Sequence, residues 1–346
     1  MIELLTLTDG GQTPESVATE LASFLDGAQR SLDIAIYDVK LDGPAEQTVL
    51  GALVAARDRG VTVRLAFNLD HPGWKQGPPP PATDPELLAA LPLETRPIPG
   101  IPDLMHHKYV VRDGSAVWTG STNWTLDSWT REENVIVRIA SEAIAASYTQ
   151  DFEQLWQKGS VEASGAVPPA EVQVGGMPVR AWFCPRRGLK LAHRIANAIG
   201  RAERRIRIAS PVITSGPILG SLCEVAAEGH VDVAGVVDIT QIEEVFSQWA
   251  GNHGAGEWKT PALKAVLRTA PFSGKRSTPY TPTSVHNYMH AKVTVCDDTV
   301  FVGSFNLSHS GERNAENVLE LEDATLADRL AAFVDEVRSR YPAVSL

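Results

Sequence analysis

The sequence has no apolar run long enough to cross a membrane. None of its windows approaches roughly eighteen uninterrupted apolar residues, the minimum expected of a spanning helix. The opening segment from Met1 to Asp9 carries neither a basic stretch nor a long apolar one, so it does not resemble a signal peptide. These absences predict a cytoplasmic protein without a transmembrane segment, which would reach any membrane substrate from solution.

Cysteine and positive charge are also scarce. The 3 cysteines (Cys184, Cys223 and Cys296) lie far apart in apolar or motif context, which predicts reduced thiols rather than a disulfide framework. The 31 lysines and arginines are outnumbered by 42 aspartates and glutamates, giving a net charge of −11. This balance excludes a surface coated with positive charge for non-specific duplex binding, but it leaves room for a local basic cleft.

The hydrophobic patterning predicts a layered α/β protein. At 346 residues and 43% hydrophobic content, the chain can form two domains of ordinary size or one large one. Its first part alternates strand and helix patterns, with Thr13 and Pro14 as a helix start. The segments expected are strand Ile2–Thr8, helix Pro14–Leu25, strand Leu32–Tyr37, helix Ala45–Arg59 and strand Val61–Phe67.

The same order of elements returns in the second part of the chain. A stretch rich in Gly, Ser, Pro and Ala, Gly159 to Gly176, predicts a linker. We therefore expect lobes at residues 1–160 and 177–346, joined by residues 161–176. The second lobe carries about ten extra residues, expected between Thr240 and Asn287. The proline run Pro78 to Pro81 predicts a stiff surface loop.

A short motif occurs once in each half. The first copy reads His106-x-Lys108, four residues, Asp113, and then Gly120-Ser121-x-Asn123. The second copy has the same residue types. Its members are His290, Lys292, Asp297, Gly303, Ser304 and Asn306. A Glu-Asn pair and an apolar run follow each copy, at Glu133 and Glu316. A single copy is a modest signal, whereas two copies in matching positions are a strong one.

The motif residues suit a phosphate group. Residues two apart on a strand share a face, so His106 projects with Lys108, and His290 with Lys292. A lysine neutralises phosphate oxygens while the neighbouring histidine faces phosphorus. The Ser and Asn side chains of each Gly-Ser-x-Asn can add neutral donors, each worth about 3 kcal/mol toward a charged transition state. No metal or other cofactor is needed for this work.

Displacement at phosphorus needs an attacking group on one side and a proton donor on the other. Two histidines supply both, because one neutral imidazole can form a phosphohistidine while the other, protonated, protonates the leaving oxygen. Symmetry alone does not choose between His106 and His290. We expect Glu133 and Glu316 to hold the second ring nitrogen of these histidines. Asp113 and Asp297 are expected to be structural residues at hairpin turns.

At these residues the sequence resembles the phospholipase D superfamily, whose signature is the duplicated His-x-Lys-x4-Asp followed by Gly-Ser-x-Asn. The resemblance covers nearly the whole chain. It implies two α/β/α sandwich lobes with the site at their interface, a covalent histidine intermediate and no metal requirement. It further implies His106 as the nucleophile and His290 as the general acid, with Gly120 and Gly303 as structural members of the motif.

The substrate is less constrained than the chemistry. Segments Trp118–Thr125 and Arg131–Asn134 are similar to the nuclease and mitochondrial-type branch, so a nuclease is the first hypothesis, although the acidic net charge counts against it. A phospholipase D or phosphatidyl transferase is the alternative, and a non-catalytic phosphate-binding protein is a third. Since one chain carries both motifs, a monomer would suffice.

Several residues near the motifs have two readings. Trp124 and Trp129 either pack in the core or stack on a substrate. Lys275 and Arg276 either lie in a solvated loop or form a basic lip. His286 is either a loop residue or part of the cleft mouth.

Overall fold

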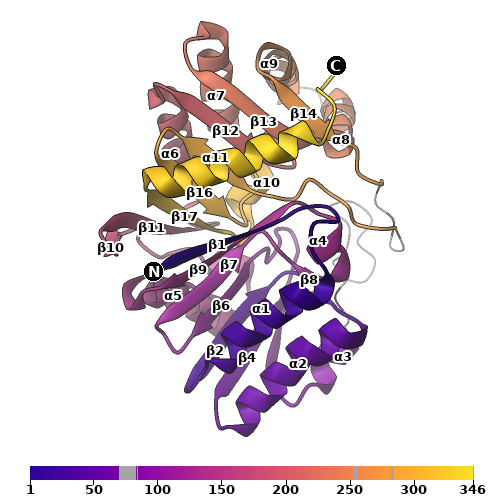
Figure 1. The fold of residues 1–346 in the computed structure, drawn as a ribbon, viewed down its shortest axis with the longest axis vertical. Helices are drawn as coiled ribbons and strands as arrows, with labels where there is room; N and C mark the ends of the chain where they lie inside the picture. The colour runs from indigo at the N-terminus through magenta and orange to yellow at the C-terminus, as the bar shows by residue number, and fades with distance from the viewer. Residues whose placement is uncertain (70–82, 84, 252–255, 280, 282–283, 346) are drawn as a thin grey trace.

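The computed structural model describes residues 1–69, 83, 85–251, 256–279, 281 and 284–345. The proline run Pro78 to Pro81 lies outside these residues. The described part contains two large mixed β-sheets with helices between and outside them, the first sheet in the lower half of Figure 1 and the second in the upper half. The layered α/β class expected from the sequence is confirmed.

The first sheet has the strand order β1-β9-β7-β6-β2-β4-β5. Its strands are β1 (Ile2–Leu7), β2 (Ser31–Ile36), β4 (Thr62–Leu69), β5 (Glu94–Pro99), β6 (Lys108–Arg112), β7 (Ala116–Gly120) and β9 (Asn134–Ala140). Strands β2, β4 and β5 run parallel, and the other pairs are antiparallel. The accompanying helices are α1 (Pro14–Asp26), α2 (Gly43–Asp58), α3 (Pro85–Ala90), α4 (Leu126–Thr130) and α5 (Glu142–Lys158). A small separate sheet pairs β3 (Val39–Lys40) with β8 (Trp124–Thr125).

The second sheet repeats this plan with the order β10-β11-β17-β16-β15-β12-β13-β14. Its strands are β10 (Val172–Val174), β11 (Met177–Phe183), β12 (Arg205–Ala209), β13 (Asp232–Asp238), β14 (Phe272–Lys275), β15 (Val293–Cys296), β16 (Thr299–Gly303) and β17 (Asn317–Glu322). Its helices are α6 (Gly188–Arg201), α7 (Gly216–Glu228), α8 (Ile239–Gly251), α9 (Gly256–Thr269), α10 (His309–Arg313) and α11 (Ala324–Ser339).

Local sequence signals place several of these elements where they were expected. Helix α1 starts after Thr13, whose side chain accepts the Ser16 N–H, with Pro14 in its first turn. Helix α5 starts after Ser141 and ends at Gly159, which adopts the left-handed conformation at φ 65°. Such caps satisfy backbone groups that a helix end otherwise leaves unpaired.

Two parts of the fold differ from the expectation. The segment from Gly159 to Gly176 was predicted to lack structure, but it contains the 3-10 turn Val161–Ala163 and strand β10, which pairs with β11. Edge strands β5 and β14 were not predicted. The range expected to hold the extra residues of the second half, Thr240 to Asn287, contains most of α8 together with α9 and β14. We propose the lobe boundaries given above, with β10 added to the second sheet.

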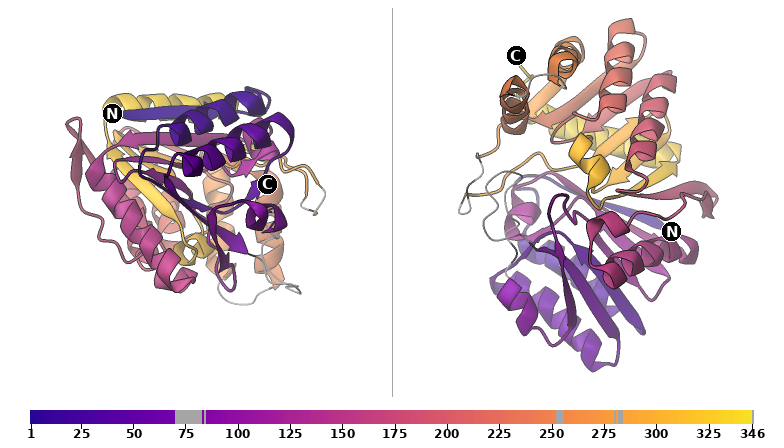
Figure 2. Two further views of the ribbon diagram at one scale, coloured as in Figure 1. Left: turned by 90° about the horizontal axis from the view of Figure 1, so that it is seen from below. Right: turned by 180° about the vertical axis from the view of Figure 1, so that it is seen from behind.

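One apolar cluster joins the two lobes. It contains buried side chains of α5, of α11 and of the facing sides of both sheets, among them Phe152, Phe333 and Leu330. Helices α1 and α2 cover the outer face of the first sheet, and α6, α7 and α9 cover that of the second (Figure 2). Because Met105 and Met289 also belong to the shared cluster, the residues that precede the two motif histidines are fixed at the lobe interface.

The glycines of the two Gly-Ser pairs are required by close approach. A Cβ on Gly120 would lie 2.1 Å from the Val135 carbonyl oxygen, and one on Gly303 would lie 2.1 Å from that of Asn317. Real Cβ atoms do not come this close, so any larger residue would push the neighbouring strand away. These glycines hold each motif loop against β9 or β17.

Candidate active site

Four basic side chains from the two motifs are buried at the lobe interface. His106 is 6% exposed, Lys108 2%, His290 8% and Lys292 3%. Each lysine ammonium donates to the main-chain oxygen of the histidine two residues earlier, at 2.8 Å for Lys108 and 2.5 Å for Lys292. The two His-x-Lys segments therefore have the same local geometry.

Each histidine is held by the other half of the chain. The backbone N–H of His106 donates to the Ala315 carbonyl oxygen at 2.9 Å. The ring Nδ1 of His106 lies 2.9 Å from the Glu316 carboxylate. The Nδ1 of His290 lies 3.1 Å from the Asn134 amide oxygen and 3.3 Å from the Glu132 carboxylate. Short backbone bridges, Met105 to Ala315 and Glu133 to Met289, run beside these contacts.

The four basic groups lie close enough to affect one another's charge. Burial lowers the pKa of His106 well below its ordinary value, and the charges of Lys108 and Lys292 lower that pKa further. The pKa of His290 falls for the same reasons, with His106 among its charged neighbours. Burial lowers the pKa of Lys108 to about 7 and, with the charge of Lys108, depresses that of Lys292 strongly. A bound anion would offset this repulsion and raise all four pKa values.

Two buried carboxylates complete the charge pattern. Burial raises the pKa values of Glu132 and Glu316 to about 7, against the charges of the neighbouring lysines, which lower them. Ser304 and Asn314 donate to Glu316, whereas Asn134 donates to Glu132. Burial thus moves the pKa values of both carboxylates and of Lys108 to about 7, and perturbed pKa values of this kind are common at catalytic sites.

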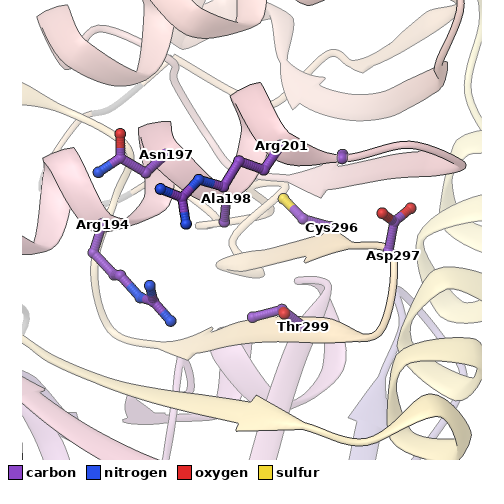
Figure 3. Close-up of a pocket in the computed structure, with 8 residues that line it drawn as sticks. Arg194, Asn197, Ala198, Arg201, Cys296, Asp297 and Thr299 are labelled. Carbon is purple, nitrogen blue, oxygen red and sulfur yellow. The ribbon is translucent and has the colours of Figure 1, made fainter.

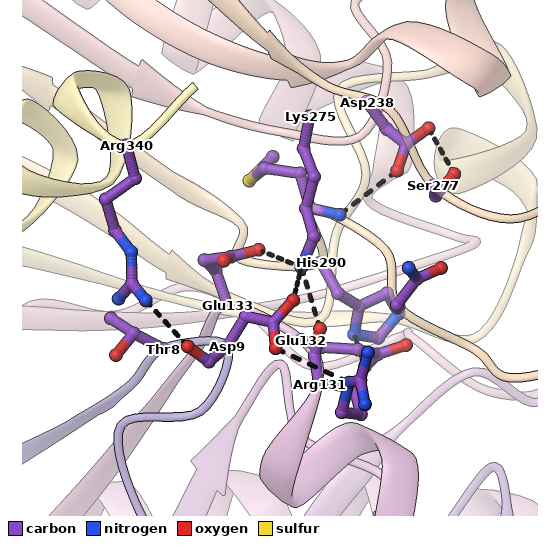
Figure 4. A network of polar contacts seen from close by, with 12 residues as sticks. Thr8, Asp9, Arg131, Glu132, Glu133, Asp238, Lys275, Ser277, His290 and Arg340 are labelled. Atoms are coloured by element: carbon purple, nitrogen blue, oxygen red, sulfur yellow. Dashed lines mark hydrogen bonds and ion pairs between the residues drawn. The ribbon is translucent and has the colours of Figure 1, made fainter.

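Glu133 does not hold a histidine, contrary to the expectation. Its carboxylate accepts from Lys275 at 2.9 Å and from the Tyr341 hydroxyl. Figure 4 shows Glu133 turned toward Lys275 while Glu132 lies beside His290. The sequence comparison had aligned Glu133 with Glu316, which is one residue out of register. Gly120 pairs with Ile136, whereas Gly303 pairs with Val318, so the second half has one residue fewer between these two strands.

The motif serines also differ from the expected phosphate donors. Ser121 Oγ donates to the Asn134 amide oxygen at 2.6 Å, and Ser304 Oγ donates to Glu316 at 2.6 Å. Each hydroxyl accepts a backbone N–H as well, and both serines are 0% exposed. Since a serine has one proton to donate, neither hydroxyl has a proton left for substrate. The serines position the groups that hold the histidines.

The motif asparagines remain available for a ligand. Among the described residues, the side-chain oxygens of Asn123 and Asn306 are buried without a hydrogen-bond partner. Buried polar atoms are rarely left unpaired in folded proteins. An amide oxygen only accepts hydrogen bonds, so Asn123 and Asn306 stay proposed phosphate-binding residues through their side-chain NH2 groups, which can donate.

The motif aspartates lie in the hairpin turns, at the opposite ends of β6 and β15 from the histidines. Asp113 adopts φ 56° and accepts the backbone N–H groups of Gln29, Arg30 and Ser31. Asp297 makes the equivalent three contacts with residues 203–205. Both carboxylates tie a hairpin to the loop before the neighbouring strand.

Tyr37 lies in the candidate site, and sequence reasoning missed it. Its ring centroid lies 4.7 Å from that of His106 in an edge arrangement, and the Lys108 ammonium lies 4.9 Å from its centre. No motif marks Tyr37, because it reaches the site from the loop after β2. It forms a half-buried aromatic wall beside His106.

The residues with two readings are now placed. Trp124 and Trp129 are core residues, 3% and 1% exposed. Lys275 is buried at the lobe interface, so neither reading of it was right, whereas Arg276 is exposed and pairs with Glu243. His286 is half-buried and its charge acts on His290.

The pocket drawn in Figure 3 is separate from this site. It has a volume of about 200 Å³ and lies beside the turn that ends β15, next to Arg194, Arg201 and Asp297. Since His290 precedes β15 and Asp297 follows it, the strand separates the pocket from the catalytic candidates. In the described ranges, no group of three His, Cys, Asp or Glu side chains is arranged to hold a metal ion.

Comparisons with known proteins give the family. A family model described as "Cardiolipin synthase, PLD-like domain" matches residues 21–156 and 195–338. Mitochondrial cardiolipin hydrolase of Xenopus laevis is 29% identical over 147 residues, which are 42% of this chain and 63% of that protein. The human protein of the same name is 27% identical over 157 residues, 45% of this chain and 57% of the relative. The match therefore spans less than two thirds of each relative.

Solved structures share the whole fold at low identity. Phosphatidylserine synthase from Haemophilus influenzae has a TM-score of 0.64 and 13% identity, covering 99% of this chain and 87% of its own. Polyphosphate kinase from Porphyromonas gingivalis has a TM-score of 0.60 and 12% identity, covering 96% and 46%. These values show the fold alone. Across the described residues, no helix is both long enough and apolar enough to cross a membrane.

Proposed function

Because the chain belongs to the phospholipase D-like family, we propose that it is a phosphodiesterase that works through a phosphohistidine intermediate without a metal. The observation that carries this proposal is the reciprocal arrangement of His106 and His290. Each imidazole is buried beside a lysine, and its Nδ1 faces an acceptor from the other half. An acceptor at Nδ1 keeps the proton there and leaves Nε2 free for chemistry.

We assign the nucleophile to His106 and the proton donor to His290. The His106 Nε2 lone pair forms a bond to phosphorus while the bond to the leaving oxygen breaks, and His290 Nε2 gives that oxygen its proton. A water molecule then gives a proton to His290 as its oxygen bonds to phosphorus. The N–P bond breaks, which releases a phosphomonoester and restores both histidines. Lys108, Lys292 and the two motif asparagines stabilise the charged phosphoryl oxygens.

For the substrate, we propose a phospholipid phosphodiester ahead of a nucleic acid. Relatives that match this chain are named cardiolipin hydrolases, and the family model carries the name of cardiolipin synthase. Val285, which is 45% exposed, directly precedes His286, whose charge reaches His290. The net charge of −11 disfavours nucleic acid binding. A nuclease remains the second candidate, because segments Trp118–Thr125 and Arg131–Asn134 are similar to the nuclease branch of the family. The cytoplasmic location also stays a prediction.

A parallel assay tests this proposal. Purified protein and His106→Ala are incubated with vesicles containing cardiolipin, vesicles of phosphatidylcholine, single-stranded DNA, duplex DNA and RNA. We expect phosphatidic acid from a lipid, intact nucleic acids and no product with the variant. Acid-labile phosphate on the protein after rapid quenching would identify the intermediate. Cleavage of nucleic acid without lipid turnover would replace the first substrate with the second, and cleavage of no phosphodiester would reject the activity.

A further inference from the structure

Strand register gives the structural equivalence of the two halves around the site. Gly120 faces Ile136 across the first sheet, and Gly303 faces Val318 across the second. Ser121 N donates to the Val135 oxygen, and Ser304 N donates to the Asn317 oxygen. Val135 and Asn317 are therefore equivalent, and so are the residues that precede them, Asn134 and Glu316. Since Glu133 and Ala315 make matching bridges, the register is the same on that side.

The equivalence reveals an exchange of two side chains. In the second half the carboxylate of Glu316 faces His106, and Asn314 two residues earlier donates to it at 3.3 Å. In the first half the amide of Asn134 occupies the place of the carboxylate. Glu132, two residues earlier, accepts from this amide at 3.2 Å. Each half keeps one carboxylate and one amide, but in opposite order.

We propose that Glu132 is the positioning residue of His290, acting on its Nδ1 proton directly and through Asn134. This assignment rests on the proposed function. The Asn134 oxygen accepts from Ser121 Oγ at 2.6 Å and can only accept from His290, so the His290 proton is held on Nδ1. Glu132, 3% exposed and 3.3 Å from Nδ1, supplies the negative charge that an amide lacks.

The backbone around Glu132 is fixed from the opposite lobe. The Lys275 ammonium donates to the Arg131 carbonyl oxygen at 2.7 Å and to the Glu133 carboxylate at 2.9 Å, on either side of Glu132 (Figure 4). A carboxylate in such a rigid segment is suited to orient an imidazole. The exchange also makes the two histidines unequal, because the Nδ1 of His106 faces the Glu316 carboxylate, whereas that of His290 lies between an amide oxygen and a carboxylate.

A leaving-group comparison tests the role of Glu132. If Glu132 orients the proton donor, Glu132→Gln should matter only where the leaving oxygen needs a proton. Its kcat/KM is measured on two aryl phosphodiesters that release p-nitrophenol or phenol, because this ratio reports the first chemical step. We expect a loss of about 10- to 100-fold for the phenol ester and less than about 3-fold for the p-nitrophenol ester. The neighbouring control, Glu133→Gln, should change both by the same factor.

The double variant Glu132→Asn/Asn134→Glu gives the first half the order of the second. This double variant keeps one carboxylate and one amide beside His290, so we expect it to keep the leaving-group dependence of the wild type. It provides a second test in case Glu132→Gln does not fold. Equal slowing of both esters by Glu132→Gln, with an active wild type, would overturn this assignment and leave the proposed function intact. A selective loss on the phenol ester by the double variant would also overturn it. An inactive wild type on both esters would reject the proposed function and this assignment with it.

Discussion

Replacing Lys275 with methionine should destabilise the protein far more than replacing its neighbour Arg276. The Lys275 side chain is 4% exposed and crosses the lobe interface to three oxygen partners. These are the Arg131 carbonyl at 2.7 Å, Glu133 at 2.9 Å and Asp9 at 3.2 Å. Methionine fills much of the same volume, so the change removes charge rather than packing.

The magnitude follows from what the substitution leaves behind. Glu133 is 0% exposed and would lose its cation, with the Tyr341 hydroxyl as its remaining side-chain partner among the described residues. Breaking a buried pair by removing one partner costs about 3–5 kcal/mol. Arg276 pairs with Glu243 at 2.8 Å, but their side chains are 64% and 51% exposed. Removing such an exposed pair costs less than about 1 kcal/mol.

Urea unfolding of the two variants, followed by circular dichroism, measures the difference. A cycle with Glu133→Gln isolates the pair, since the double variant removes both charges and should be less destabilised than the sum of the single variants by about 2 kcal/mol or more. An equal, small effect of Lys275→Met and Arg276→Met would show that the cluster in Figure 4 does not hold the lobes together.

Three other predictions follow from the same contacts. His106→Ala and His290→Ala should each lower kcat/KM by at least about 1,000-fold with unchanged circular dichroism, and full activity in either variant would exclude the two-histidine reaction. EDTA should leave turnover unchanged, whereas a loss restored by a divalent cation would indicate metal chemistry. Partial burial raises the pKa of Asp113, but the backbone donors of Ser31, Arg30 and Gln29 outweigh it and lower the pKa overall. Asp113→Ala should therefore cost about 1 kcal/mol above the unfolded pKa near 3.9. That difference should disappear as pH falls through the lower folded pKa in urea unfolding at several pH values.

Periodicity and caps were sufficient to predict most of the fold. Strands such as β2 and β13 are buried on both faces, so their sequences are mostly apolar. The start of helix α1 is marked by its N-cap Thr13 and by Pro14 in its first turn. Edge strands gave weaker signals. Strand β5 contains two prolines and alternates poorly, and β14 contains a glycine, so their pairing depends on the neighbouring strand rather than on their own sequence.

The predicted site was most accurate where the motif itself specifies geometry. The His-x-Lys spacing indicated a shared face, and both lysines lie beside their histidines. The residues that contact the Nδ1 atoms of the histidines were harder to predict, because aligning the two sequence repeats does not give the pairing register of the strands. Because the second half has one residue fewer here, matching the sequences aligned Glu133 with Glu316, although the strand register makes Asn134 the structural equivalent of Glu316. The acidic doublet of Glu132 and Glu133 was the available clue.

Burial was the other quantity that sequence reasoning could not supply. Lys275 lies in a polar segment that reads as a solvent-exposed loop, yet its partners come from residues more than a hundred positions earlier. Ser121 and Ser304 were expected to contact phosphate, since a hydroxyl beside a phosphate motif is an obvious donor. In the folded protein each hydroxyl proton is already donated to another side chain.

The reciprocal support of His106 by Glu316 and of His290 by Asn134 has a consequence for biosynthesis. Until the second half has been made, His106 lacks Glu316 and His290 does not yet exist, so the proposed two-histidine reaction requires both halves to have folded together. We expect two separately expressed halves to gain the proposed activity when they dock with one another.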